Sequence, residues 1–138
     1  DPSVVVDCAH NAASADCLAK TIREVFPGQS PVLVFGSMRD KDVAGVLAEL
    51  LPIARHAIMT RADHPRASTP ASLASSASGA GCPVSVADNL PEALDKALMV
   101  AGGSGLVLVT GSVSLAGEAL RAAQIRWPHL VSLGAHQP

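Results

Sequence analysis

Hydrophobic residues follow two alternating patterns along the chain, short unbroken runs and longer stretches with helical spacing. Short, mainly apolar stretches predict strands at residues 4–7, 32–35, 57–60, 84–86 and 106–109, and the unbroken runs at 32–35 and 106–109 are typical of strands buried on both faces. A stretch with helical spacing follows each strand pattern, as in Ala15, Leu18, Ile22, Val25 and Phe26. Alternating strands and helices predict an α/β domain of three layers, with a mostly parallel sheet of five to six strands flanked by helices.

The helix ends are marked by residues with a known preference for these positions. Asp42, Thr69 before Pro70, and Asn89 with Glu92 are typical of helix N-termini, and Pro27-Gly28 is typical of a helix end. No repeat, linker or low-complexity segment divides the chain, so residues 1–138 are predicted to form one domain. We expect residues 126–138 to be a loose tail, and the start two residues before a strand suggests a fragment of a longer protein.

Composition narrows the class of protein. The 49% of apolar residues excludes general disorder, and the 2% of aromatic residues means that Val, Leu, Ile and Ala build the core. A formal net charge of −2 gives no reason to expect a nucleic acid or a membrane as partner, and no apolar run is long enough to span a bilayer. Cys8, Cys17 and Cys82 have neither disulfide nor zinc spacing, so we expect buried, reduced thiols in a cytoplasmic protein.

Polar side chains gather where the predicted strands end. Because parallel strands have their carboxyl ends at one edge of a sheet, these residues are expected to surround a ligand there. The set comprises Asp7, His10 and Asn11, then Ser37, Asp40 and Lys41, then Asp63, His64 and Arg66, and finally Thr110, Gly111 and Ser112. Such a set could hold a ribose, a phosphate or an amino-acid carboxylate, with Arg66 suited to a bidentate contact.

Each of these candidates also has a purely structural explanation. Asp7, Asn11 and Ser112 could cap helices, His10 could be a structural imidazole, Asp40, Lys41 and Asp42 could form a solvated turn with an N-cap, and Arg66 could be a surface charge. His56, His129 and His136 have no partner at a recognisable spacing and are interpreted as surface residues. The chain also has no P-loop, dinucleotide fingerprint or nucleophile elbow, so we expect no complete catalytic site and no metal site.

Four motifs in order carry a resemblance to a known family. They are Asp7-Cys8-Ala9-His10-Asn11, the stretch from Gly36 to Asp42, Pro65-Arg66-Ala67, and Val109-Thr110-Gly111-Ser112 followed by Gly117-Glu118. Together they resemble the C-terminal domain of folylpolyglutamate synthases, which are relatives of the Mur ligases. The sequence departs from the family pattern at Cys8, Ala12, Ser68, Val113 and Ser114.

The resemblance implies a Rossmann-like C-terminal domain of an ATP-dependent ligase. Members of that family add L-glutamate to a folate through an acyl phosphate, and many bacterial members also join dihydropteroate to glutamate. The family's P-loop, magnesium sites and most folate contacts belong to a larger N-terminal domain, which would be the partner of this chain. ATP and Mg²⁺ would therefore be held mainly outside these residues, and this domain by itself is predicted to be inactive.

The resemblance also implies roles for individual residues. Asp7 and His10 would face the nucleotide or the reacting phosphate, supported by Asn11, while Arg66 and Ser112 would contact the incoming glutamate. Lys41, with Asp40 beside it, would form the rim of the site or the interface with the partner domain. Two other functions remain open, a Mur ligase of cell-wall synthesis, which Asp63-x-Pro65-Arg66 also resembles, and a separate non-catalytic module that binds a nucleotide or a protein.

Overall fold

The computed structural model describes residues 2–128, in which strands and helices alternate as the sequence predicts. The elements are β1 (Ser3–Val6), α1 (Ala12–Val25), β2 (Val32–Phe35), α2 (Val43–Leu50), the 3-10 turn η1 (Leu51–Ile53), β3 (His56–Met59), α3 (Pro70–Ser76), β4 (Val84–Val86), α4 (Leu90–Ala101), β5 (Leu106–Thr110) and α5 (Val113–Arg126). Arg126, where the tail was expected to begin, still belongs to α5, and residues 129–138 lie outside the described part.

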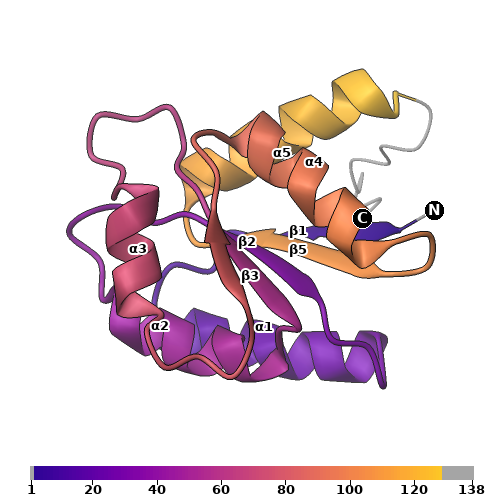
Figure 1. Ribbon diagram of the computed structural model, residues 1–138, viewed down its shortest axis with the longest axis horizontal. Coiled ribbons are helices and arrows are strands. Elements are labelled where there is room, and N and C mark those ends of the chain that lie inside the picture. Colours follow the sequence, from indigo (N-terminus) through magenta and orange to yellow (C-terminus); the bar gives the residue numbers. More distant parts are fainter. Residues whose placement is uncertain (1, 129–138) are drawn as a thin grey trace, which may run out of the picture.

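The sheet has five strands in the order β1-β5-β2-β3-β4, and all of the pairings are parallel. From β1 to β4 the chain moves across the sheet in one direction, and it then returns to place β5 between β1 and β2. Helices α1, α2 and α3 cover one face, and α4 and α5 cover the other (Figure 1). This change of face is what right-handed crossovers require when the direction reverses, and it makes the end of β5 a switch point, the place where open α/β sheets generally bind ligands.

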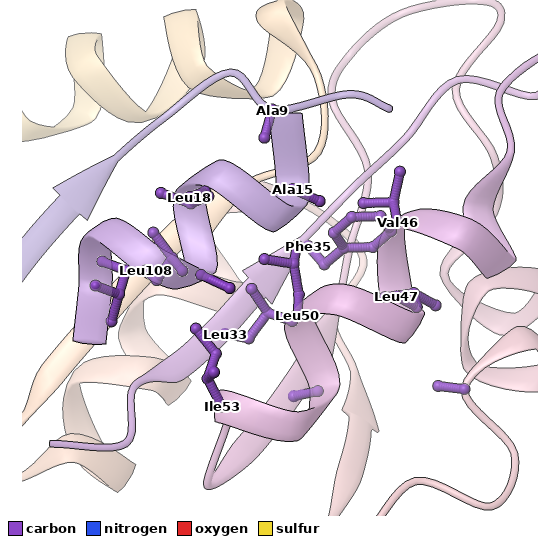
Figure 2. Packing of buried hydrophobic residues seen from close by; sticks show 14 of the residues in the cluster. Ala9, Ala15, Leu18, Leu33, Phe35, Val46, Leu47, Leu50, Ile53 and Leu108 are labelled. Carbon is purple, nitrogen blue, oxygen red and sulfur yellow. The ribbon is translucent and has the colours of Figure 1, made fainter. Parts of the chain in front are cut away.

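Two hydrophobic cores, one on each face of the sheet, hold the layers together. Every residue of β2 is buried, with Leu33 and Phe35 in one core and Val32 and Val34 in the other, as expected for a strand covered on both faces. Figure 2 shows Phe35 between α1 and α2, with its ring directed toward Val46. The cores therefore fix β2 in the middle of the sheet, directly beside the switch point at the end of β5.

The turns from strand to helix are fixed by side-chain caps. The cap residues are Asn11, Asp42, Thr69, Asn89 and Ser112, and each accepts a hydrogen bond from a backbone N–H of the first helical turn. In α1 the cap is reciprocal, because Ser14 also accepts from the backbone N–H of Asn11. The caps predicted at Asp42, Thr69 and Asn89 are thus confirmed, and every loop at the carboxyl edge ends at a defined residue.

Several expectations about burial were wrong. Of the two apolar residues predicted at the end of the first helix, Phe26 packs against the core, whereas Val25 is 61% exposed. All three thiols are free, as expected, but they are not all buried. Cys8 is exposed because it lies in a turn, and Cys17 is exposed because it lies on the outer side of α1. Cys82 is half-buried. His56 is not a surface residue but a half-buried one whose Nε2 lies 3.0 Å from Ser85 Oγ, whereas His129 and His136 lie outside the described residues.

No helix within residues 2–128 has the length and apolar character needed to cross a membrane.

Candidate functional site

At the carboxyl edge of the sheet, the residues that follow β2 and β5 lie in close contact. Gly111 has a φ of 121°, a backbone conformation that favours glycine, and a Cβ at this position would collide with the carbonyl oxygen of Gly36. The backbone N–H of Gly36 donates to the carbonyl of Thr110 at 3.3 Å. The chain can therefore turn sharply from β5 into α5, which places Ser112 next to the end of β2.

A hollow of about 230 Å³ lies at this edge. Its walls come from the loops that follow β1, β2, β3 and β5, and the residues lining it are His10, Met38, Lys41, His64, Arg66, Gly111, Ser112, Val113 and Ser114. The hollow thus brings together six of the candidate residues from the sequence, namely His10, Lys41, His64, Arg66, Gly111 and Ser112. Ser112 is at the same time the N-cap of α5, with Oγ accepting from the backbone N–H of Leu115 at 3.1 Å.

Asp7, Asn11 and Asp40 are not among the residues that line the hollow. Asp7 Oδ1 accepts from the backbone N–H of Ala9 at 2.8 Å, which stabilises the turn after β1. Asn11 Oδ1 caps α1 by accepting from the backbone N–H and the hydroxyl of Ser14, both at 2.8 Å. These contacts agree with the structural explanation of Asp7 and Asn11, which hold the turn that carries His10.

Two half-buried histidines line the hollow, and their Nδ1 contacts leave opposite hydrogen-bonding groups on Nε2. His10 Nδ1 donates to the carbonyl of Cys8 at 3.0 Å, so the neutral ring keeps a lone pair on Nε2 and can accept there. His64 Nδ1 accepts from the backbone N–H of Arg66 at 3.1 Å, so its proton is on Nε2 and the ring donates there. His64 was noted as a strand-end residue in the sequence, but nothing in the sequence singled it out from its neighbours.

The charged side chains that line the hollow, Lys41 and Arg66, are both cations. In the part of the chain that the structure describes, the ion pairs are Asp16–Lys20, Glu92–Lys96 and Asp95–Arg126, and none of them includes Lys41 or Arg66. The N-terminus of α5 contributes Val113 and Ser114 to the wall, and a helix N-terminus carries a partial positive charge. Two exposed cations and a helix N-terminus around one hollow favour an anionic ligand, such as a carboxylate or a phosphate.

The two loops that carry the cations are joined by hydrogen bonds. Met38 and Ala67 form an antiparallel bridge, the backbone N–H of Arg39 donates to the carbonyl of Arg66 at 2.8 Å, and Arg39 Nη2 donates to the carbonyl of Pro65 at 2.9 Å. Two of the motifs that suggested the family, Gly36 to Asp42 and Pro65-Arg66-Ala67, are therefore one structural unit. Their spacing in the sequence gave no sign of this pairing.

A larger hollow, of about 430 Å³, lies between α2 and α3. The residues that line it are small or apolar and uncharged, namely Ala44, Leu47, Ala48, Leu51, Pro52, Ala54, Ser76, Ser78, Gly79, Ala80 and Gly81. It offers neither a cation nor an imidazole to a ligand, so its size does not make it the better candidate. Nor do three or more His, Cys, Asp or Glu side chains within residues 2–128 gather into a group able to hold a metal ion.

Comparison with known proteins shows the family to which the chain belongs. Residues 1–113 match the family model described as the Mur ligase, glutamate ligase domain. The chain belongs to this family. The resemblance that the four motifs suggested is therefore confirmed, and the Rossmann-like α/β fold is shared with solved folylpolyglutamate synthases.

Individual relatives point to folate enzymes. The dihydrofolate synthase/folylpolyglutamate synthase of Mycobacterium tuberculosis is 34% identical, over 86% of this chain and 27% of the relative. A probable bifunctional folylpolyglutamate synthase/dihydropteroate synthase of Halobacterium salinarum is 36% identical, over 92% of this chain and 15% of the relative. The M. tuberculosis folylpolyglutamate synthase solved with ADP and AMPPCP has a TM-score of 0.80 and 36% identity, over 86% of this chain and 29% of that one. The chain thus spans less than a third of the length of each of these relatives.

Proposed function

We propose that the full-length protein containing this chain is an ATP-dependent ligase that adds L-glutamate to a folate, and that this chain is its C-terminal domain. The family match, together with relatives named as folylpolyglutamate synthases, supports this assignment. In this proposal a larger N-terminal domain is the partner of the chain and supplies the P-loop. Location in the cytoplasm stays a prediction from the sequence.

The observation that carries the proposal is the hollow at the carboxyl edge. The hollow is lined by Arg66 and Lys41, which have no ion-pair partner within the described residues. His64, whose Nε2–H can donate a hydrogen bond, also lines it. Arg66 binds a glutamate carboxylate in a bidentate manner, and Lys41 and the N-terminus of α5 add positive charge for the second carboxylate. Ser112, the N-cap of α5, also lines the hollow.

His10 provides the hydrogen-bond acceptor that an amino acid also needs. The incoming amine is a donor, and Nε2 of the neutral His10 ring can accept from it, since Nδ1 already donates to Cys8. A phosphate oxygen would instead require a protonated ring. We therefore propose that His10 lies at the junction between the amine of glutamate and the reacting phosphate, and that Asp7 and Asn11 hold its turn in place.

The nucleotide itself needs more room than this hollow offers. The hollow has a volume of about 230 Å³, which is below the roughly 300–1,000 Å³ of sites for drug-sized ligands. A hollow of this size suits an amino acid but not a whole ATP molecule. ATP is therefore proposed to lie mainly on the N-terminal domain and to reach this chain at the turn of Asp7, His10 and Asn11. The described residues do not gather a set of ligands for Mg²⁺, so its ligands are proposed to lie on that domain too.

Substrate profiling of the full-length protein tests the proposal. The protein is given ATP, Mg²⁺ and labelled L-glutamate with tetrahydrofolate, dihydropteroate or a muropeptide as acceptor, and the products are identified by mass spectrometry. We expect glutamate to be joined to tetrahydrofolate with release of ADP, and a product from dihydropteroate would show the dihydrofolate synthase activity as well. Ligation to the muropeptide alone would identify a cell-wall Mur ligase, and no ligation at all would favour the non-catalytic module.

The isolated domain provides a second test. Phosphoryl activation of a carboxylate requires groups that stabilise the developing charge, and the P-loop and magnesium ligands are proposed to lie elsewhere. Supplied with ATP, Mg²⁺, folate and glutamate, the 138-residue domain is expected to release no phosphate above background. Turnover by this domain would contradict the proposal that the P-loop and the magnesium ligands lie on the N-terminal domain.

A further inference from the structure

Glu118 makes a long-range contact that the proposed function does not yet use. It lies in the second turn of α5, and its Oε2 accepts a hydrogen bond from the backbone N–H of Asp63 at 2.7 Å, across 55 positions of the sequence. Asp63 directly precedes His64 in the loop between β3 and α3. The bond therefore joins α5, the helix that Ser112 caps, to the loop that carries His64 and Arg66.

The contact is not an ion pair. Among the ion pairs within residues 2–128 none includes Glu118, so the carboxylate of this half-buried residue is bonded to a backbone amide without a neutralising cation. A hydrogen bond to an ionised acceptor is stronger than one between neutral groups. The bond fixes the main chain at Asp63. A loop whose main chain is fixed also holds its side chains in defined positions.

A second contact holds the same loop from the other side. Arg39, in the loop after β2, donates through Nη2 to the carbonyl of Pro65, and its backbone N–H donates to the carbonyl of Arg66. The segment from Asp63 to Arg66 is thus bonded to α5 at one end and to the loop after β2 at the other. Between these two attachments lies His64, with its Nδ1 occupied by the N–H of Arg66.

We infer that Glu118 is a positioning residue for the incoming amino acid, because it sets the distance of Arg66 and His64 from Ser112. This inference rests on the proposed function, in which these residues surround glutamate. Glu118 does not line the hollow and acts only through the loop. If the bond is lost, the loop stays attached through Arg39 but its Asp63 end becomes free, so the carboxylate contacts of glutamate lose their fixed spacing.

Two substitutions separate positioning from a general role in folding. Glu118→Ala removes the acceptor, whereas Glu118→Gln keeps an oxygen that can accept from the same N–H without the charge. Glu24→Ala is the matched control, since Glu24 is an exposed glutamate in the last turns of α1 with no bonded partner among the described residues. All variants are made in the full-length protein.

The test combines steady-state kinetics with hydrogen exchange of the peptide covering residues 61–69. We expect Glu118→Ala to raise the KM for glutamate about tenfold, the size expected for loss of one hydrogen bond to a charged group, with the KM for ATP unchanged. Exchange in the peptide should become faster, Glu118→Gln should recover most of both effects, and Glu24→Ala should change neither.

Each other outcome overturns a defined part of the inference. Unchanged exchange in Glu118→Ala would show that Glu118 does not hold the loop, whatever the activity. Faster exchange with an unchanged KM for glutamate would show that the loop does not position the amino acid. If the wild-type protein does not ligate glutamate, the proposed function fails and the substrate role with it, while the exchange result still decides whether Glu118 holds the loop.

Discussion

Gly111 packs directly against the carbonyl group of Gly36, where β5 and β2 end. No side chain fits between them, because a Cβ on Gly111 would collide with that carbonyl oxygen and with the ring of Phe35. The φ of 121° at Gly111 adds backbone strain for any other residue. The hollow at the carboxyl edge depends on this contact, since Gly111 and Ser112 form part of its wall.

Gly111→Ala is therefore expected to lower the free energy of unfolding by about 2 kcal/mol or more, from backbone strain and steric overlap together. Urea denaturation of the variant and the wild type measures the loss. Gly103→Ala is the control, because a Cβ on Gly103 would meet no atom within 4 Å and the residue has no positive φ. Equal stability of the Gly111→Ala variant and the wild type would mean that the two strand ends are not in contact.

Asn11 and Asn89 are matched N-caps, each accepting from a backbone N–H three residues later. Replacing either residue by Ala is expected to lower the free energy of unfolding by about 1 kcal/mol. Because Asn11 holds the turn that carries His10, only Asn11→Ala is also expected to reduce kcat of the full-length protein. A loss of activity with no loss of stability in Asn11→Ala would show instead that Asn11 binds a ligand directly.

The three cysteines are expected to differ in reactivity. The thiolate is the reactive form, and burial raises the pKa of the Cys82 thiol above its usual value, so less thiolate is present there at neutral pH. Cys8 and Cys17 are exposed. Brief treatment of the native protein with N-ethylmaleimide, followed by peptide mass spectrometry, should show Cys8 and Cys17 labelled well before Cys82. Equal labelling of all three thiols would contradict the burial of Cys82.

The sequence predicted the order and type of the elements because each strand is a short, mainly apolar stretch, unbroken in β2, and a stretch with helical spacing follows each one. It also predicted the edge of the sheet at which the candidate residues lie, since this follows from parallel strands alone. Val32–Phe35 and Val84–Val86 match the observed strands, and the caps at Asp42, Thr69 and Asn89 are in the expected places.

What the sequence could not predict depends on contacts between distant segments. The bond from Asp63 to Glu118 and the bridge between Met38 and Ala67 join loops that have no common pattern in the sequence. The tautomers of His10 and His64 depend on local backbone geometry and not on residue type. The exposure of Cys17 was mispredicted because a small thiol was assumed to be buried, although the periodicity of α1 places it opposite Ala15 and Leu18.

The glutamate site is tested most directly by the KM for glutamate of Arg66 variants in the full-length protein. Arg66→Ala is expected to raise this KM about tenfold or more while leaving the KM for ATP nearly unchanged, because it removes a charged bidentate contact. Arg66→Lys should recover only part of the loss, since an ammonium group cannot bind a carboxylate through two parallel hydrogen bonds. Arg55→Ala, at an exposed arginine just before β3, is the control and should have no effect. A KM for glutamate that is unchanged in Arg66→Ala would contradict the placement of glutamate in this hollow.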